Sequence, residues 1–317
     1  MIVLLHGARA HGAVERYVEQ IAAALGDDGV LVQPHLHGFD EGSLRELVRI
    51  LRRLRPQVAH VMDVWPQALV AARLARVPRV LVTHHTPELP RRDNLAGRAW
   101  QRLAWLTRPE VIYTSEADRA SDGRRPSHVI PLGIDLDRFE GARPALEPDG
   151  PRVGNVARLA PQKDHRTLIE AARLVPEAEF VIVGDGELRG ELERLAAGAR
   201  VRFMGAREDV PELLASFDVF AFPSRFEGLC LAVIEAQAAG VPVVATPVGG
   251  IRETVVEGET GLLVPTGDPA ALAAATRRLL EDRPAAEAMA AEAKRRVRER
   301  FSLERMVTAT LRLYRHA

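Results

Sequence analysis

The stretch "DVFAFPSRFEGLCLAVIEAQAAGVPVVAT", residues 218–246, reads as an apolar run, a longer segment that suits a helix, and a second apolar run. The runs at 218–223 and 241–246 have the length and composition of buried strands. Between them, Glu235 stands among apolar residues where a helix would bury whatever faces inward. An ionised carboxylate is costly there unless a partner binds it. The stretch therefore predicts a β–α–β unit whose helix holds a charge for a partner.

The same alternation runs through the whole chain in two similar halves. We expect strands in the first half at 2–6, 30–36, 58–62, 79–83, 111–115 and 128–132, and in the second half at 152–157, 179–184, 201–205, 218–223, 241–246 and 261–264. Such β–α alternation favours parallel sheets with helices on both faces, and ligands gather at the carboxyl ends of the strands. The sequence predicts an α/β protein with two Rossmann-like, doubly wound domains facing a central cleft.

The segment "FEGARPALEPDGPR", residues 139–152, divides the halves with three prolines and two glycines, which is typical of a linker. We expect an N-terminal domain over residues 1–140, a linker over 141–150 and a second domain over 151–302. The last segment, 303–317, predicts a lone amphipathic helix with no strand of its own to cover.

Composition restricts the class of protein. A chain of 317 residues, 47% apolar and 27% charged, is long enough for two soluble domains with separate cores. One cysteine excludes an internal disulfide framework. The opening "MIVLLHGARAHG" lacks the pattern of a signal peptide, and no run of about 18 apolar residues suits a membrane span. We expect a cytoplasmic protein.

Positive charge is concentrated in the first half, although the formal net charge is zero. Residues 44–108 hold thirteen arginines against four acidic residues, a local excess of nine positive charges. We favour arginines that shield amphipathic core helices. The alternative is peripheral contact with an anionic membrane at the inner face, or an anionic acceptor. Nucleic acid is not an expected partner, since aromatic residues make up only 5% of the chain.

Three glycine or aspartate motifs have structural interpretations. "GARAHGAV" (7–14) has the spacing of a phosphate loop but lacks its Lys and Ser/Thr. "GDGELRG" (184–190) places its third glycine one residue late for a dinucleotide fingerprint, which favours a tight β–α turn. "DLD" (135–137) precedes the linker, and we interpret it as structural rather than as a metal site.

An anion site is predicted where two cations precede a helix. In "VARLAPQKDHRTLIEAARLV" (156–175), Arg158 and Lys163 lie near a helix N-terminus, where the dipole disfavours positive charge. Two cations there suggest an anion between them, although two solvated side chains are the simpler alternative. Gly228, Leu229 and Cys230 are expected to begin a helix whose free N–H groups can bind a phosphate.

The two glutamates of the opening stretch then have a role. With a diphosphate held by the cations and the helix start, without any metal, Glu235 would face hydroxyls of the same ligand. Glu227, on the loop before the helix, can reach another hydroxyl. The alternative, that Glu235 pairs with a buried arginine, stays equally open at this point.

The segment "SRFEGLCLAVIEAQAAGVPVVATPVGGIRETVVEGETGLLV" (224–264) resembles the donor-site signature of the retaining glycosyltransferase family 4, of GT-B fold. "VARLAPQKD", "VGDGELR", "HVIPLGIDLDRF" and "HGAVERYVEQIAAAL" also match its pattern in the right order, and the N-terminal domain is short for the family. The resemblance implies a nucleotide-diphosphate sugar as donor, a hexose-type sugar transferred with retention, and a final helix, 303–317, that crosses back to the first domain. It implies no cofactor and no metal.

The resemblance also implies roles for particular residues. Arg158 and Lys163 would bind the diphosphate and stabilise it as the leaving group, Glu235 would hold the ribose hydroxyls, and Glu227 the hydroxyls of the transferred sugar. His85 would contact the sugar near its reacting carbon. The remaining expected donor-site residues are Gly12, Gly184, Arg207, Gly228, Leu229 and Cys230.

No nucleophilic carboxylate stands out opposite the leaving group, so we expect same-face attack by the acceptor hydroxyl. Two other classes stay open: a nucleotide-sugar epimerase of similar shape and a non-catalytic nucleotide-sugar-binding subunit. The donor base and the acceptor, whether sugar, lipid-linked or small molecule, are not specified by the sequence.

Overall fold

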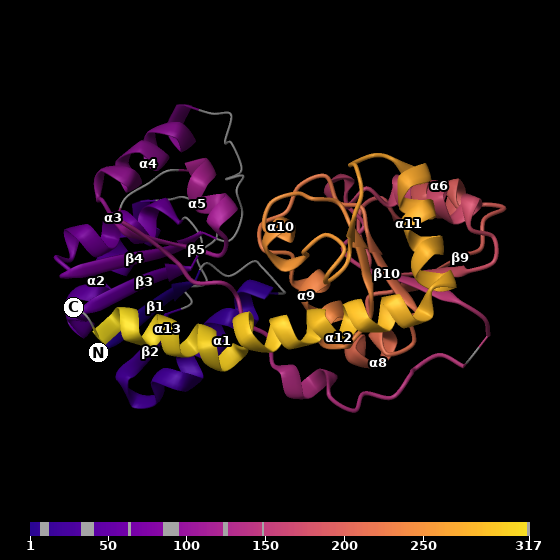
Figure 1. The fold of residues 1–317 in the computed structure, drawn as a ribbon. Coiled ribbons are helices and arrows are strands. Elements are labelled where there is room, and N and C mark those ends of the chain that lie inside the picture. Colours follow the sequence, from indigo (N-terminus) through magenta and orange to yellow (C-terminus); the bar gives the residue numbers. More distant parts are fainter. Residues whose placement is uncertain are drawn as a thin grey trace. The chain divides into compact units, whose positions relative to one another are not determined.

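The computed structural model describes residues 1–6, 13–32, 41–62, 65–84, 95–122, 126–147 and 149–315. It divides into two compact units, Met1–Leu132 together with Glu304–Ala317, and Gly133–Leu303 (Figure 1). Residues 141–150, the expected linker, belong to the second unit in this division. Each unit is built on its own parallel sheet, which confirms the predicted α/β class with two doubly wound sheets.

The first unit contains a six-stranded parallel sheet in the order β2-β1-β3-β4-β5-β6. Its strands are β1 (Ile2–His6), β2 (Gly29–Val32), β3 (Val58–Met62), β4 (Arg79–His84), β5 (Glu110–Tyr113) and β6 (Ser127–Val129). The helices that connect or follow them are α1 (Ala13–Leu25), η1 (Gly26–Asp28), α2 (Glu41–Leu54), α3 (Pro66–Leu74), α4 (Leu95–Leu106), α5 (Glu116–Asp122) and α13 (Leu303–Arg315). Each strand lies within a few residues of a predicted apolar run.

The central strand β3 shows why these runs become strands. All five of its residues are buried, as expected of a strand covered by helices on both faces. Its Ala59 and Val61 pack with Val3 and Val82 of the neighbouring strands and with Leu69 of α3 in one continuous core. None of the helices in the described ranges is long and apolar enough to cross a membrane.

The second unit contains a six-stranded parallel sheet in the order β12-β11-β10-β7-β8-β9. Its strands are β7 (Arg152–Val156), β8 (Glu179–Val183), β9 (Val201–Gly205), β10 (Val219–Phe222), β11 (Val243–Ala245) and β12 (Leu262–Leu263). Its helices are η2 (Leu136–Phe139), η3 (Pro161–Lys163), α6 (His165–Leu174), α7 (Arg189–Leu195), α8 (Val210–Leu214), α9 (Leu231–Ala238), α10 (Ile251–Thr254), α11 (Pro269–Glu281) and α12 (Arg283–Arg300). The order brings β7 and β10 together at the centre.

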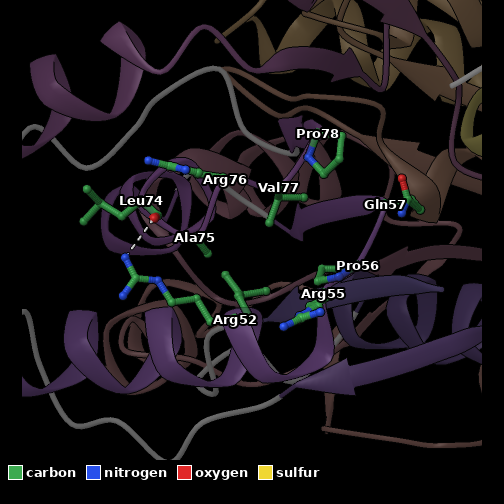
Figure 2. Close-up of a pocket in the computed structure, with 10 residues that line it drawn as sticks. Arg52, Arg55, Pro56, Gln57, Leu74, Ala75, Arg76, Val77 and Pro78 are labelled. Atoms are coloured by element: carbon green, nitrogen blue, oxygen red, sulfur yellow. Dashed lines mark hydrogen bonds between the residues drawn. The ribbon is translucent and has the colours of Figure 1, made fainter.

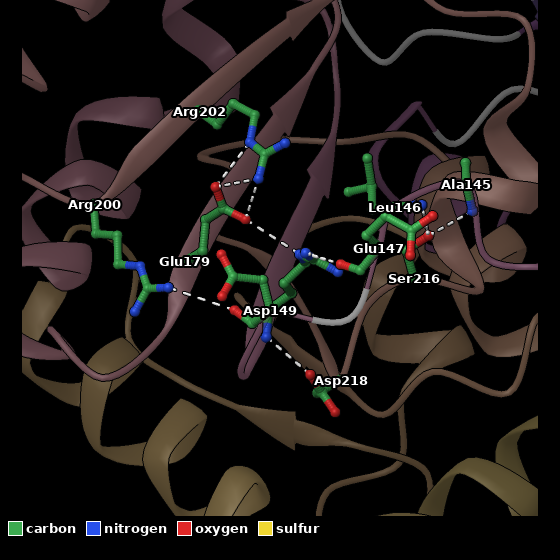
Figure 3. A network of polar contacts seen from close by, with 10 residues as sticks. Ala145, Leu146, Glu147, Asp149, Glu179, Arg200, Arg202, Ser216 and Asp218 are labelled. Atoms are coloured by element: carbon green, nitrogen blue, oxygen red, sulfur yellow. Dashed lines mark hydrogen bonds and ion pairs between the residues drawn. The ribbon is translucent and has the colours of Figure 1, made fainter.

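A polar network attaches residues 145–149 to the second unit's sheet (Figure 3). The buried Arg152, at the start of β7, pairs with Glu179 of β8 at 3.1 Å and donates to the carbonyl of Glu147. Glu179 also pairs with Arg202 of β9. The Ser216 hydroxyl accepts from the backbone N–H groups of Ala145 and Leu146 at 2.9 and 3.1 Å. Because so many bonds fix it, this part of the expected linker is built into the unit.

The C-terminal helix α13 joins the first unit through a buried polar chain. The hydroxyl of Tyr314 lies 2.5 Å from Nδ1 of His60, whose Nε2 lies 2.6 Å from the Thr83 hydroxyl. His60 belongs to β3 and Thr83 to β4, so the helix contacts the middle of the sheet. Arg79 of β4 also donates to the carbonyl of Leu313. Buried hydroxyl and imidazole groups need such partners, because an unpaired one costs about 1–3 kcal/mol.

We predict that Tyr314→Phe lowers the free energy of unfolding by about 1–3 kcal/mol, since it leaves the buried Nδ1 of His60 without its partner. Urea unfolding followed by circular dichroism measures the change. Arg312→Gln, on an exposed position of the same helix, is the control and should unfold like the wild type. Equal stability of Tyr314→Phe and wild type would contradict the anchoring role.

Candidate functional site

The candidate site lies at the carboxyl edge of the second unit's sheet, on the loops that follow β7 and β10. These strands are parallel neighbours, with Val219 opposite Val153 and Phe220 opposite Gly154, so the loops after them leave the sheet at the same edge. The loops are joined directly. The Arg225 N–H donates to the Gln162 carbonyl at 2.8 Å, and the Gln162 amide donates to the Phe226 carbonyl at 3.0 Å.

Lys163 and Glu227, both predicted site residues, form an ion pair across these loops. Nζ of Lys163 lies 2.6 Å from Oε1 of Glu227, and the Ser224 hydroxyl donates to the same oxygen at 2.6 Å. The Glu227 side chain is only 7% exposed, whereas that of Lys163 is 18% exposed. Nζ also lies 5.1 Å from the centre of the Phe222 ring. The acid is therefore fixed in the protein, while the ammonium keeps some contact with solvent.

Arg158, the second predicted cation, is exposed at the start of the loop after β7. Its side chain makes no hydrogen bond or ion pair with any residue in the described part of the chain. The loop itself is fixed by backbone bonds, since the Leu159 N–H donates to the Asp185 carbonyl at 2.9 Å and the Leu188 N–H donates to the Leu159 carbonyl at 3.1 Å. A rigid backbone thus presents a guanidinium whose five donors are available to an anion.

Helix α9 begins at Leu231 with Cys230 as its N-cap, so the prediction that Gly228 and Leu229 already belong to the helix is wrong. The reason is a backbone contact: the Gly228 carbonyl accepts from the Gly250 N–H at 2.8 Å and is not available to a helical turn. The free N–H groups of the first turn are therefore those of Cys230 and the three residues after it.

Glu235 lies on α9 and is half-buried, between the buried Ile234 and Ala236. Burial raises the pKa of the Cys230 thiol, and the negative charges of Glu227 and then Glu235 raise it further. Both carboxylates thus lie close to the same thiol. The structure brings together the predicted pair of acids, the helix start and the two cations on one edge of one sheet.

A double glycine after β11 supports this arrangement. Gly249 has a φ of +48°, and a Cβ there would lie 1.7 Å from the carbonyl oxygen of Glu227. A Cβ on Gly250 would lie 2.7 Å from the carbonyl oxygen of Gly228. Only glycine permits this approach, so "PVGG" (247–250) sets the position of the turn that carries Glu227. The sequence signal, two glycines just after a strand, was available but received no role in the sequence analysis.

Residues 28–138 match the family described as "Glycosyltransferase Family 4", and residues 150–282 match "Glycosyl transferases group 1". A curated relative, the GDP-mannose-dependent monoacylated alpha-(1-6)-phosphatidylinositol monomannoside mannosyltransferase of Corynebacterium glutamicum, is 30% identical over 93% of this chain and 92% of its own. The chain belongs to glycosyltransferase family 4. The Escherichia coli UDP-Gal:alpha-D-GlcNAc-diphosphoundecaprenol alpha-1,3-galactosyltransferase is also 30% identical, over 77% of this chain and 71% of its own.

Solved structures confirm the fold of this glycosyltransferase. HepE of Anabaena, solved in complex with UDP, superposes with a TM-score of 0.84 over the full length of both chains at 22% identity. Sucrose-phosphate synthase from Thermosynechococcus elongatus gives 0.81 at 24% identity, over 99% of this chain and 98% of its own. The predicted GT-B fold is therefore confirmed, and the family match with its curated relatives confirms the enzyme class.

Of the other predicted donor-site residues, two lie outside the residues that the structure describes, and two make contacts of their own. Gly12 and His85 fall outside the described residues. Gly184 has a φ of +133°, and a Cβ there would lie 2.0 Å from the Ala157 carbonyl oxygen, so a close backbone contact already requires this glycine. Arg207, after β9, is exposed and forms a 2.5 Å ion pair with Asp209.

Two residues that the sequence analysis did not single out support Lys163 from the C-terminal side. Asp164 is buried and has a left-handed φ of 49°, which is uncommon outside glycine. It accepts from the Thr167 hydroxyl at 2.9 Å and pairs with Arg225 at 3.1 Å. His165, also buried, contacts Oδ1 of Asn155 through Nε2 at 3.1 Å. "DLD" (135–137) behaves as its structural interpretation expects, since Asp135 caps η2.

We predict that Gly249→Ala displaces the 227–229 turn, because the added Cβ would meet the Glu227 carbonyl. Thermal unfolding should show a loss of several degrees, and binding of nucleotide diphosphates, measured by calorimetry, should weaken. Gly258→Ala is the matched control, because Gly258 also has a positive φ, +75°, but a Cβ there meets nothing within 4 Å. Equal losses in the two variants would mean that the positive φ alone requires glycine at position 249, and would contradict a role for the contact with the Glu227 carbonyl.

We also predict that the free energy of unfolding decreases as the pH is lowered, because His165 is buried in its neutral form. Burial, together with the nearby positive charge of Lys163, lowers the pKa of His165 to about 4 from its usual 6.5. The folded protein keeps the imidazole neutral, whereas the unfolded chain takes up a proton as the pH falls below about 6.5. Between pH 6.5 and 4 the protein should lose up to about 3 kcal/mol from this group alone.

The measurement is urea unfolding at several pH values for wild type and His165→Gln, whose amide can still donate to Asn155. The difference in unfolding free energy between the two proteins should shrink or reverse toward pH 4. A difference that stays constant with pH would contradict a neutral, buried His165.

Proposed function

We propose that this glycosyltransferase moves a hexose-type sugar from a nucleotide-diphosphate sugar to an acceptor hydroxyl, with retention and without a metal ion. The observation that carries the proposal is the Lys163–Glu227 ion pair at the carboxyl edge of the second sheet, together with Arg158, whose side chain has no partner among the described residues. The printed names of similar proteins support such a donor: one relative is GDP-mannose-dependent, and HepE was solved with UDP-glucose. They leave the choice between guanosine and uridine open.

The leaving diphosphate is stabilised by positive groups already in place. Lys163 carries three N–H donors, of which Glu227 engages one, so two remain for phosphate oxygens. Arg158 adds a guanidinium that can bind phosphate with two parallel hydrogen bonds. The free N–H groups at the start of α9 point their partial positive charge to the same edge. Such preorganised groups are usually the largest contribution to catalysis when negative charge develops on a leaving group.

Glu227 suits the hydroxyls of the transferred sugar. Its Oε1 accepts from both Lys163 and Ser224, whereas Oε2 makes no hydrogen bond with any residue of the described ranges. A carboxylate oxygen held in this way can accept a hydrogen bond from a sugar hydroxyl without moving. Glu235, one turn into α9, is assigned to the ribose hydroxyls in this proposal.

Retention is part of the proposal. We assign Glu227, whose Oε1 is bound by Lys163 and Ser224, to the sugar hydroxyls as a hydrogen-bond acceptor, and we assign no carboxylate as a nucleophile. We infer attack on the face that the leaving group vacates. The bond from the anomeric carbon to the acceptor oxygen forms as its bond to the diphosphate oxygen breaks, and the acceptor proton passes to that diphosphate.

Lipid-linked acceptors occur in the printed names of two similar proteins. One relative acts on a phosphatidylinositol mannoside and another on a diphosphoundecaprenol-linked sugar, as their names state. Among the acceptor classes that the sequence left open, we propose a lipid-linked sugar, reached by peripheral contact with the inner face of the membrane. The arginine-rich first unit supplies charge for that contact.

We predict that Arg158→Ala and Lys163→Ala each weaken binding of UDP or GDP by about 10- to 100-fold, the effect of losing one charge-assisted hydrogen bond. Isothermal calorimetry with UDP, GDP and ADP measures this without an acceptor. Arg166→Ala removes an exposed arginine of α6 that pairs with Glu191, and it should bind like the wild type. Near-normal binding by Arg158→Ala would remove the basis of the proposal.

Assays with nucleotide sugars distinguish the proposed transferase from the two alternative functions, an epimerase and a non-catalytic binding subunit. An epimerase would convert the sugar of the donor with no acceptor present, which proton NMR detects as a second set of ring signals. A non-catalytic subunit would bind the donor but release no nucleotide diphosphate with any acceptor. Release of UDP or GDP with an α-linked product from an α-linked donor supports retention.

A further inference from the structure

A second site candidate lies at the opposite edge of the first unit's sheet. A cavity of about 660 Å³ occupies the amino-terminal edge, where the chain passes from α2 into β3 and from α3 into β4 (Figure 2). Three arginines, Arg52, Arg55 and Arg76, line it, and its described lining includes no acidic residue. Its volume falls within the range of about 300–1,000 Å³ typical of small-molecule sites.

Two of the three arginines in this cavity have no side-chain partner among the residues that the structure describes. Arg52 reaches across from α2 and donates to the Leu74 carbonyl at 3.3 Å (Figure 2). The side chains of Arg55 and Arg76 are exposed and form no hydrogen bond or ion pair with the residues that the structure describes. By contrast, Arg79, at the start of the adjoining strand, is held by both oxygens of Glu110 at 2.6 Å. Like charges gathered without a counter-charge repel one another, so an anion would stabilise them.

Two of these arginines, Arg55 and Arg76, have a left-handed backbone conformation that glycine adopts more easily than other residues. Arg55 and Arg76 have φ values of 48° and 58°, each at the end of a helix, where glycine usually occupies the left-handed position. Arg108, after α4, repeats the pattern with a φ of 51° but does not line the cavity. A side chain at such a position is strained, whereas glycine would adopt the same backbone conformation without that cost.

The second unit contains the same junction with glycine. Ala239, Gly240, Val241 and Pro242 lead from α9 into β11, as Ala75, Arg76, Val77 and Pro78 lead from α3 into β4. Both junctions have the same three backbone hydrogen bonds. In the second unit, the N–H groups of Ala239, Gly240 and Val241 donate to the carbonyls of Glu235, Gln237 and Ala236, respectively. In the first unit, those of Ala75, Arg76 and Val77 donate to Ala71, Arg73 and Ala72. Glycine therefore suffices for the turn, and the arginine supplies something other than structure.

We propose that Arg52, Arg55 and Arg76 bind a phosphate group of an anionic ligand in this cavity, at a site separate from the donor site. Guanidinium groups bind phosphate with paired, parallel hydrogen bonds, and three of them can surround one phosphate monoester or diester. Leu74, which is half exposed, adds an apolar wall beside the charges. The phosphate belongs either to a small soluble ester or to a phospholipid headgroup.

The test compares Arg76→Gly with Arg108→Gly. Each removes one arginine from a left-handed position after a helix of the first unit, but only Arg76 lines the cavity. Both should fold with a melting temperature equal to or above that of the wild type, because glycine suits the backbone at each position. Arg76→Gln is a second way to remove the charge if the glycine variant loses stability.

Two probes distinguish the sources of the phosphate. Calorimetry with sn-glycerol 3-phosphate tests a soluble ester, and co-sedimentation with phosphatidylglycerol vesicles, against phosphatidylcholine vesicles, tests a headgroup. For one of the two probes, Arg76→Gly should lower the affinity tenfold or more and Arg108→Gly less than twofold. Loss with Arg108→Gly as large as with Arg76→Gly, or no binding of either probe by the wild type, would overturn the site.

Discussion

The ion pair between Lys163 and Glu227 joins two loops that are 64 residues apart in the chain. Removing two such charges from water is costly, and a pair of this kind is weak evidence for stability. Its geometry is instead held by neighbours, through the Ser224 hydroxyl and the backbone bonds between Gln162 and residues 225–226. The pair thereby presents unused donors and an unused acceptor oxygen together, which a ligand with both phosphates and hydroxyls can engage.

Close backbone contacts bring these loops together. Of the glycines after β8 and β11, Gly184 lies against the carbonyl of Ala157 and Gly249 against that of Glu227. Each glycine lets one loop approach the carbonyl of another loop that carries a site residue. Their contribution to the site is therefore indirect: they set the positions of the backbone from which Arg158 and Glu227 extend.

The sequence predicted the strands well because a strand buried on both faces is a nearly continuous apolar run, as in β3 and β8. It also indicated Lys163, because cations beside a helix start require a reason, and Glu227, because it lies on the loop just before the expected phosphate-binding helix. It did not predict that these two side chains pair, nor that α9 starts at Leu231. Both depend on contacts between distant segments, such as the bond from Gly250 to Gly228, that local patterns do not contain.

The two units differ in how the arginines at the amino-terminal edge of each sheet are paired with acidic residues. In the second unit, Arg152 and Arg202 share Glu179 at the starts of three adjacent strands, so part of their charge is offset where the sheet begins. At the corresponding edge of the first unit, Arg79 has Glu110, but Arg55 and Arg76 have no acid among the described residues. Since Gly240 shows that the turn at Arg76 forms without a side chain, the difference between the two edges is one of charge rather than of fold. An uncompensated cationic edge is stable in water but gains free energy from any phosphate that fits between its guanidinium groups.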